Sequence, residues 1–214
     1  MFSSAANASA PADSSANHLR TRIINAARRL CFADGVEALS ARRLANEAGC
    51  SPGALYLHFK NLEGILHELR LEGHELLARY LARPGQEMHA ADRLATMQQE
   101  YHRFGLENPN HFRLMFLTRI DAAALGEALG AEGASLWVVT EAARLGMERG
   151  ELPPQFDPLV ISNVTWMAIH GLTSMVVSGH AAVTAHGINH TDLLAGVTAA
   201  TRAWLRPCSV KGKD

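Results

Sequence analysis

The segment from Ser40 to Phe59 constrains the fold of this chain most, because it carries the start and stop signals of two short helices. Ser40 is a good N-cap for a first helix, and Gly49 can take the left-handed conformation that ends it. Ser51 can cap a second helix whose first position is Pro52, where the missing N–H costs nothing. Two helices joined by a glycine turn form a helix-turn-helix, the motif that places its second helix in the major groove of DNA.

The second of these helices has two distinct sides. Leu55 belongs to an apolar stripe that must pack against other helices. Because successive residues turn by about 100° around a helix, Gly53 and Leu57 fall opposite Leu55 and face outward. On the flanks, Tyr56 and His58 can hydrogen-bond to bases or phosphates, whereas Leu57 offers apolar contact to a thymine methyl. The residues expected to contact DNA are Ser40, Arg42, Arg43, Ser51, Pro52, Gly53, Ala54, Tyr56, Leu57, His58 and Lys60.

Charge is distributed unevenly along the chain. The whole sequence has 20 Lys and Arg against 21 Asp and Glu, a balance that by itself argues against nucleic-acid binding. Between His18 and Leu62, however, there are seven Lys and Arg against three Asp and Glu. A basic segment on an acidic remainder is typical of a DNA-binding domain that gains affinity from phosphate contacts. Arg20 and Arg22 are the candidates for a minor-groove contact, although any single Arg can equally belong to a solvated helix face.

Three motifs resemble the DNA-binding domain of TetR-family transcriptional regulators. They are Ile-Ile-x-Ala-Ala-x-x-Leu-x-Phe-x-x-Gly from Ile23 to Gly35, Leu44-Ala45-x-x-Ala48-Gly49, and Leu55-Tyr56-x-His58-Phe59. The resemblance implies a one-component regulator, a repressor that binds a palindromic double-stranded DNA operator and is released by a small-molecule effector. The family commonly has Lys where this chain has Leu62, so we expect that phosphate contact either to be missing or to be made by Lys60.

The remainder of the chain also has a helical pattern. Periodic apolar segments are separated by Pro and Gly without strand alternation, which predicts an all-α fold. About nine helices are expected, at residues 18–34, 41–48, 52–59, 62–82, 86–107, 109–119, 133–149, 157–179 and 190–206.

These helices are expected to form two domains after a short tail. Residues 18–62 would be a three-helix, helix-turn-helix DNA-binding domain, and residues 63–207 a helical effector-binding and dimerisation domain. Residues 1–17 are mostly Ala, Ser, Asn and Pro and lack a basic segment, which predicts a disordered tail and not a signal peptide. We therefore expect a cytoplasmic protein.

A charge-free segment marks the expected subunit interface. No Asp, Glu, Lys or Arg occurs from Pro158 to Thr191, but Ser, Thr, Asn and His within it are too frequent for a membrane span. A helix without charge on any face is buried on more than one side, so the helix at 157–179 is expected to contact both the core and a partner subunit. The helix at 190–206 would be the second helix of this subunit interface. The family resemblance implies that two such helices from each copy form a four-helix bundle in a homodimer.

A second resemblance concerns the effector domain. Residues 108–116 and 166–171 are similar to the C-terminal domain of a TetR subgroup named after its Trp, His and Gly. Trp166 and His170, one turn apart, are expected to line a ligand cavity together with other aromatic and Met side chains. The alternative is that these residues are ordinary core, because apolar stripes are common and cavities are few. The expected ligand-binding residues are Tyr101, Phe104, Phe112, Met115, Phe116, Trp166 and His170.

Catalytic and metal-binding patterns are weak in this sequence. His67 and His74 are each followed by Glu, as in a zinc protease helix, but the second His one turn later is missing. His186 and His190 are four residues apart, but Gly and Asn between them predict a loop. The three Cys have no paired spacing, and no phosphate-binding Gly-rich loop occurs.

We therefore expect no metal, no cofactor and no enzymatic activity. Two alternatives to a DNA-binding regulator stay open: a helical small-molecule-binding protein that has lost DNA binding, and a helical hydrolase or metal enzyme.

Overall fold

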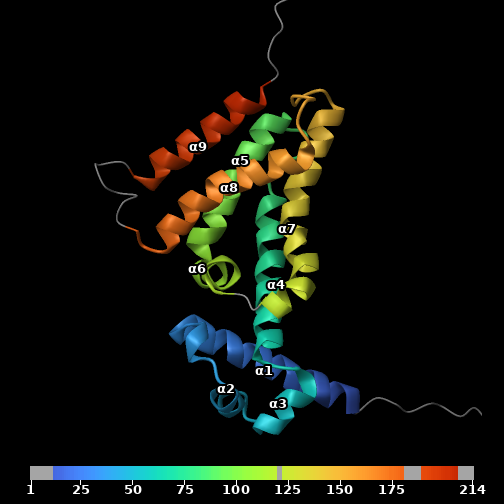
Figure 1. Ribbon diagram of the computed structural model, residues 1–214, viewed down its shortest axis with the longest axis vertical. Coiled ribbons are helices and arrows are strands. Elements are labelled where there is room, and N and C mark those ends of the chain that lie inside the picture. Colours follow the sequence, from blue (N-terminus) through green and yellow to red (C-terminus); the bar gives the residue numbers. More distant parts are fainter. Residues whose placement is uncertain (1–11, 120–121, 181–188, 207–214) are drawn as a thin grey trace, which may run out of the picture. The chain divides into compact units, whose positions relative to one another are not determined.

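The computed structural model describes residues 12–119, 122–180 and 189–206. These residues form helices and connecting turns and contain no strand, which confirms the all-α prediction (Figure 1). The elements are α1 (Ala12–Asp34), η1 (Val36–Ala38), α2 (Ala41–Ala48), α3 (Pro52–His58), α4 (Leu62–Leu81), α5 (Ala90–Glu107), α6 (Pro109–Phe112), η2 (Arg113–Leu117), α7 (Ala122–Glu148), α8 (Pro158–Val177) and α9 (His190–Leu205). The chain divides into two compact units, Met1–Leu69 and Arg70–Asp214, and the division falls within α4.

The helix-turn-helix in the N-terminal unit forms as its capping residues predict. The Ser40 hydroxyl accepts a hydrogen bond from Arg43 N (3.3 Å) at the start of α2, and Gly49 ends α2 with a φ of 65°. The Ser51 hydroxyl accepts one from Ala54 N (3.2 Å) at the start of α3. Each cap satisfies a backbone group that the helix itself leaves open, and the positive φ of Gly49 is one that other residues rarely adopt. The predicted helix-turn-helix is confirmed.

A small apolar core holds α1, α2 and α3 together. Ile23 and Ala27 of α1 and Leu44 of α2 are fully buried, and α1 packs directly on α2. Leu55 and Phe59 complete this core from α3 and the residue that follows it. Because its inner side is fixed in this way, the opposite side of α3 is presented outward.

Two helices begin earlier in the chain than predicted. α1 begins at Ala12 and not near residue 18, so part of the segment predicted to be a disordered tail is helical. α7 begins at Ala122 and not near residue 133, since its Ala, Leu and Glu residues outweigh the helix-weakening effect of Gly there. Of the predicted tail, residues 1–11 lie outside the described part of the chain.

The predicted helix at 109–119 is interrupted. It consists of α6, a single turn that begins with Pro109, followed by η2, a turn of π-helix. π turns widen the hydrogen-bonding register by one residue and occur often at functional sites. The side chains of Met115 and Phe116 project from this turn, and both belong to the cavity described below.

α5 is the centre of the C-terminal unit. It packs against α7, α8 and α9, and its Leu94, Met97 and Phe104 side chains are fully buried. Figure 1 shows α8 and α9 running next to each other across α5. The core of this unit is therefore built around α5.

Of the described helices, only α8 is long and apolar enough to span a membrane, and length and composition alone are weak evidence for a span. Ile161, Thr165 and Ile169 on one side of α8 are buried in the protein core. One side of α8 therefore packs in the core of the C-terminal unit.

Candidate functional site

The outer side of α3 carries exposed side chains of several kinds. Leu57 is 84% exposed and Tyr56 53%, while Leu55 on the inner side is 1% exposed. Ser51, Pro52 and Gly53 are also exposed, and Ala54 and His58 are half-buried. An exposed leucine next to a tyrosine on a helix whose other side is anchored gives a fixed surface that can enter a groove.

The Arg and Lys side chains around the helix-turn-helix differ in whether they already bind other groups of the protein. The side chains of Arg42 and Lys60 are exposed and make no hydrogen bond or ion pair with any described residue. Arg43 is exposed but forms an ion pair with Asp34 and also donates to Ala38 O (3.5 Å). Arg42 and Lys60 are thus free to meet phosphates, whereas Arg43 would have to exchange a protein partner.

The two arginines considered for the minor groove are held within the N-terminal unit. Arg22 donates to the carbonyls of Ala48 and Gly49 at the end of α2, where a cation also suits the helix dipole. Arg20 forms an ion pair with Glu68 (2.6 Å) and lies over the Phe59 ring, 5.0 Å from its centre. The structure therefore gives both arginines a structural contact that the sequence did not predict.

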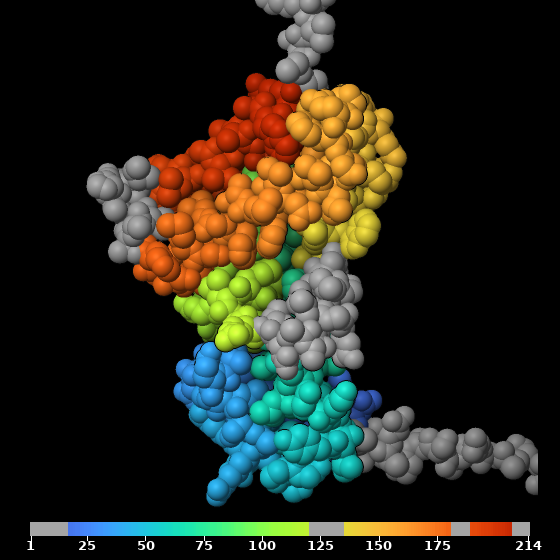
Figure 2. Space-filling view, viewed as in Figure 1, coloured from blue at the N-terminus to red at the C-terminus, as the bar shows by residue number. Residues whose placement is uncertain are grey.

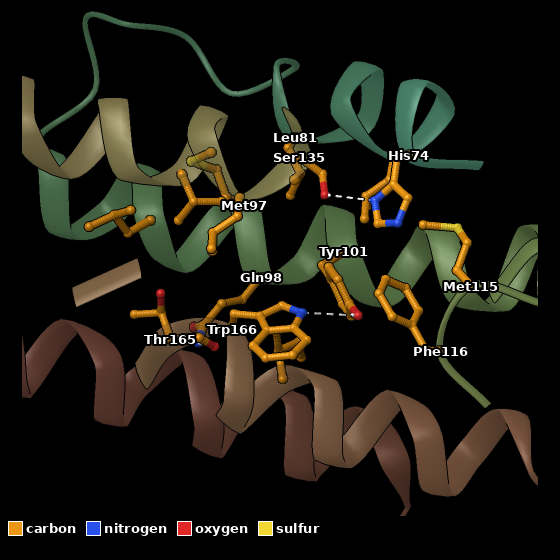
Figure 3. A pocket seen from close by; sticks show the side chains of 15 residues that line it. His74, Leu81, Met97, Gln98, Tyr101, Met115, Phe116, Ser135, Thr165 and Trp166 are labelled. Carbon is orange, nitrogen blue, oxygen red and sulfur yellow. Dashed lines mark hydrogen bonds between the residues drawn. The ribbon is translucent and has the colours of Figure 1, made fainter. Parts of the chain in front are cut away.

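The C-terminal unit contains a cavity of about 400 Å³, within the size range of small-molecule sites. Its wall is built from α4, α5, η2, α7 and α8 (Figure 3). The apolar lining residues are Leu77, Leu81, Leu94, Met97, Met115, Phe116, Leu136, Val139 and Ile169. None of the described lining residues is Asp, Glu, Lys or Arg. The cavity therefore suits a largely apolar molecule.

The expected ligand residues separate into two groups. Tyr101, Met115, Phe116 and Trp166 line the cavity. The remaining three, Phe104, Phe112 and His170, do not: both phenylalanines are fully buried core, and His170 contacts the hydroxyl of the lining residue Tyr101. A helical apolar stripe has the same spacing whether it faces a cavity or a filled core, so the sequence cannot separate the two.

Hydrogen bonds tie part of the cavity wall to His170. Trp166 Nε1 donates to the Tyr101 hydroxyl (3.3 Å), which lies 2.8 Å from His170 Nδ1, and His170 Nε2 lies 3.2 Å from the Ser174 hydroxyl. Because an indole can only donate, we assign the Tyr101 proton to His170 Nδ1. Burial raises the pKa of Tyr101 and lowers the pKa of His170, so both are neutral near pH 7. This part of the wall is uncharged and its polar atoms are paired.

Four polar residues of the wall were missed by the sequence prediction. His74 Nδ1 lies 3.2 Å from the Ser135 hydroxyl, and Gln98 Nε2 donates to the backbone carbonyl of Thr165 (2.9 Å). The available signal was a polar residue within an apolar stripe: His74 precedes Leu77 by three residues on the same helix face.

The outer surface of α8 is apolar. Its exposed large side chains are Leu159, Val160, Val164, Met167 and Met175. Figure 2 shows α8 in orange and α9 in red side by side over one face of the C-terminal unit. The exposed side of α9 carries mainly small residues, Ala195, Gly196, Ala199, Ala200 and Ala203. An apolar face of this kind is a candidate for contact with another protein surface.

The histidine considered as a metal ligand has another partner. His190 Nδ1 lies 3.2 Å from Nε2 of the buried His102, and His186 lies outside the described residues. Within the described part of the chain, no three His, Cys, Asp or Glu side chains lie close enough to hold a metal ion.

Comparison with known proteins gives the family. Residues 23–69 match the family described as bacterial regulatory proteins, tetR family. Residues 94–204, more than half of the chain, match the tetracyclin repressor-like C-terminal domain. The chain belongs to the TetR family. The resemblance inferred from the three N-terminal motifs is confirmed.

Among curated relatives, this TetR-family chain is 32% identical over 73 residues to the HTH-type transcriptional regulator UidR of Escherichia coli (strain K12). That match covers 34% of this chain and 37% of UidR. The chain thus spans little more than a third of the length of the curated relatives it matches.

Solved structures of TetR-like fold match over most of both chains. A protein of unknown function from Rhodococcus sp. RHA1 is 25% identical with a TM-score of 0.74, over 88% of this chain and 96% of that chain. A bacterial regulatory protein in the tetR family from Rhodococcus RHA1 is 22% identical with a TM-score of 0.63, over 89% and 98%. The transcriptional regulator FadR from Bacillus subtilis, in complex with stearoyl-CoA, is 17% identical with a TM-score of 0.67, over 87% and 99%. The TetR fold therefore extends through both units of this chain.

Proposed function

We propose that this protein is a one-component transcriptional repressor that binds a palindromic operator as a homodimer and responds to a small-molecule effector. The observation that carries this proposal is the outer side of α3, where Leu57 and Tyr56 are exposed while Leu55 beside them is buried. A large apolar side chain that folding leaves in water is a candidate for contact with a partner. Membership of the TetR family makes the DNA major groove the natural partner.

Base readout is assigned to α3 and phosphate contact to its surroundings. Leu57 would touch a thymine methyl, and Tyr56 and His58 would hydrogen-bond to base edges or to the backbone. Gly53 and Ala54 let the helix come close to the bases because they lack bulk. The phosphate contacts are assigned to Ser40, Arg42, Arg43, Ser51 and Lys60, with an open N–H group at the start of α3 among the donors. Pro52 has no N–H and would touch the DNA only through its ring.

The homodimer is assigned to the outer faces of α8 and α9. Met167 is 56% exposed at the middle of α8, and the small residues of α9 would let a second copy of α9 approach closely. A two-fold dimer presents two copies of α3, which explains why a palindromic operator would be read.

The effector site is assigned to the cavity of the C-terminal unit. α4 lines it with His74, Leu77 and Leu81, and continues as one helix into the N-terminal unit. An effector that prefers one arrangement of α4 would therefore change operator affinity, in proportion to its differential affinity for the two arrangements. The related FadR in complex with stearoyl-CoA supports an effector with a hydrocarbon part.

Finer assignments belong to the same proposal. Trp166, His170 and Gly171 share α8, which supports the subgroup named after these three residue types. A regulator that acts on DNA would work in the cytoplasm and without enzymatic activity of its own.

A helical small-molecule-binding protein that has lost DNA binding is the second candidate, favoured by the near-neutral total charge and by Leu62.

Selection of bound DNA from random sequence, followed by a salt-controlled shift assay, tests DNA binding. We expect the selected sequence to be palindromic and Gly53→Leu to abolish its binding. A Cβ at Gly53 would meet nothing closer than 3.9 Å, so this variant is expected to fold normally. Failure to enrich any sequence, or full binding by the Gly53→Leu variant, would remove DNA binding through α3.

Leu57→Ala provides a milder test with a matched control. It removes an exposed leucine from α3, and we expect weaker binding to the selected operator by about 1–3 kcal/mol, most strongly at one base pair. Leu106→Ala removes an exposed leucine from α5 and should leave operator affinity unchanged.

A further inference from the structure

The described wall of the cavity has no side chain that can balance a negative charge. None of its described lining residues is Lys or Arg, and most are Leu, Met, Val, Ile or Phe. Residues 122–134 of α7, which come directly before the lining residue Ser135, contain no Lys or Arg either. An anion in this cavity would therefore lack a cation in the wall beside it.

The two titratable rings of the wall do not supply the missing charge. Burial raises the pKa of Tyr101, so its hydroxyl stays neutral, and that hydroxyl lies 2.8 Å from His170 Nδ1. His74 turns Nδ1 to the Ser135 hydroxyl (3.2 Å), and its Nε2 is buried. Neither ring therefore presents a charged donor to a ligand.

The uncharged donors of the wall are already used within the protein. Trp166 Nε1 donates to the Tyr101 hydroxyl (3.3 Å), and Gln98 Nε2 donates to the Thr165 carbonyl (2.9 Å). The Thr165 hydroxyl donates to the backbone of its own helix, α8. An anion would have to compete with these bonds for its hydrogen bonds.

A carboxylate gives up its hydration when it enters such a cavity, and an apolar wall without a cation does not replace it. A ketone of the same shape gives up much less, because it has no net charge. We infer that the effector is an uncharged, mainly hydrocarbon molecule, and that the cavity rejects a carboxylate of the same shape. This inference rests on the proposed effector function of the cavity.

Displacement of a hydrophobic dye from the full-length protein, at neutral pH and constant salt, tests the inference with two probes. 2-Nonanone and octanoate have the same hydrocarbon chain and carbonyl group, and the ketone has a methyl group where octanoate has its second oxygen. We expect 2-nonanone to displace the dye at a concentration about a hundredfold lower than octanoate. This comparison uses the unaltered protein and requires no variant to fold.

Leu136→Lys tests whether the missing cation is the cause. Leu136 is a half-buried lining residue of α7, so a lysine there can bring its ammonium group to the cavity along an apolar stem. We expect the preference for 2-nonanone to fall about tenfold in this variant. The matched control Leu136→Met also has an unbranched side chain but no charge, and it should keep the full preference.

Each outcome decides between the inference and the function beneath it. Equal displacement by the two probes in the unaltered protein overturns the inference and leaves the effector cavity in place. A preference that is the same in Leu136→Lys and Leu136→Met overturns its assignment to the missing cation. If the dye does not bind, or if neither probe displaces it, the effector cavity itself is wrong and the inference falls with it.

Discussion

Gly105 of α5 lies directly against Thr173 of α8, with no room for a side chain between them. A Cβ at Gly105 would lie 2.3 Å from Thr173 Cγ2 and 3.3 Å from Cδ2 of Phe112. Thr173 cannot easily turn away, because its hydroxyl donates to Ile169 O (2.8 Å) and contacts His102 Nδ1 (3.0 Å). The close approach of α5 and α8 therefore depends on this glycine.

Gly105→Ala is expected to lower the free energy of unfolding by about 1–3 kcal/mol, the usual cost of overpacking a well-packed core. Urea denaturation followed by circular dichroism measures this change. Gly64→Ala is the control: a Cβ there would meet its nearest neighbour at an ordinary 3.6 Å, so stability should stay the same or rise slightly. An undiminished stability of Gly105→Ala would show that α5 and α8 can separate without loss.

The salt dependence of operator binding should identify the phosphate contacts. Arg42→Ala and Lys60→Ala each remove an exposed cation without a protein partner, so each should reduce the slope of log affinity against log salt by about one. Arg144→Ala is the control, because Arg144 is already paired with Glu141 and Glu148 on α7. A slope unchanged by both test variants would place the phosphate contacts elsewhere.

A charged residue introduced on the outer side of α8 tests the proposed subunit interface. Met167→Glu places a carboxylate on the exposed apolar side of α8, where a dimer would have to bury it. We expect sedimentation velocity to show a dimer for the unaltered protein and a monomer for this variant. Leu106→Glu adds the same charge at an exposed leucine of α5 and should remain dimeric. A dimer that survives Met167→Glu would require an interface other than α8.

Local signals in the sequence predicted the N-terminal unit well. The caps Ser40 and Ser51 and the turn residue Gly49 act within one or two helical turns, so their effect is visible without knowledge of the fold. The ion pair of Arg20 with Glu68 joins residues far apart in the sequence, so no local sequence pattern predicts it.

The cavity was predicted in outline but not in detail. Tyr101 and Trp166 line it as expected, whereas Phe112 is core. Which residues of an apolar stripe face a void depends on how five elements meet, and helical spacing carries no information about that. Gln98 was missed because a polar residue is an unusual choice for a buried stripe, and its partner, the Thr165 carbonyl, is a backbone atom 67 residues away.

The buried His102, in contact with the half-buried His190, makes the stability of the C-terminal unit depend on pH. The Thr173 hydroxyl donates to a carbonyl and so accepts from His102 Nδ1, which leaves His102 Nε2 to accept from His190 Nδ1 (3.2 Å). Burial, and next the charge of His190, lower the pKa of His102 from the usual 6.5 to about 4. Because the unfolded chain binds this proton more readily, the contribution of His102 is fully present above pH 6.5 and is lost as the pH falls towards 4.

Replacement of His102 should therefore flatten the pH profile of stability. The shift corresponds to about 3 kcal/mol of unfolding free energy between pH 6.5 and 4. Urea denaturation across this range should show a steep decline for the unaltered protein and a shallower one for His102→Gln, although the latter is less stable near neutral pH. A decline remains in the variant because burial also lowers the pKa of His170, with the same sign. His180→Gln, which removes an exposed imidazole away from this pair, is the control and should keep the steep decline. An unchanged slope in His102→Gln would mean that the folded protein accommodates the protonated pair.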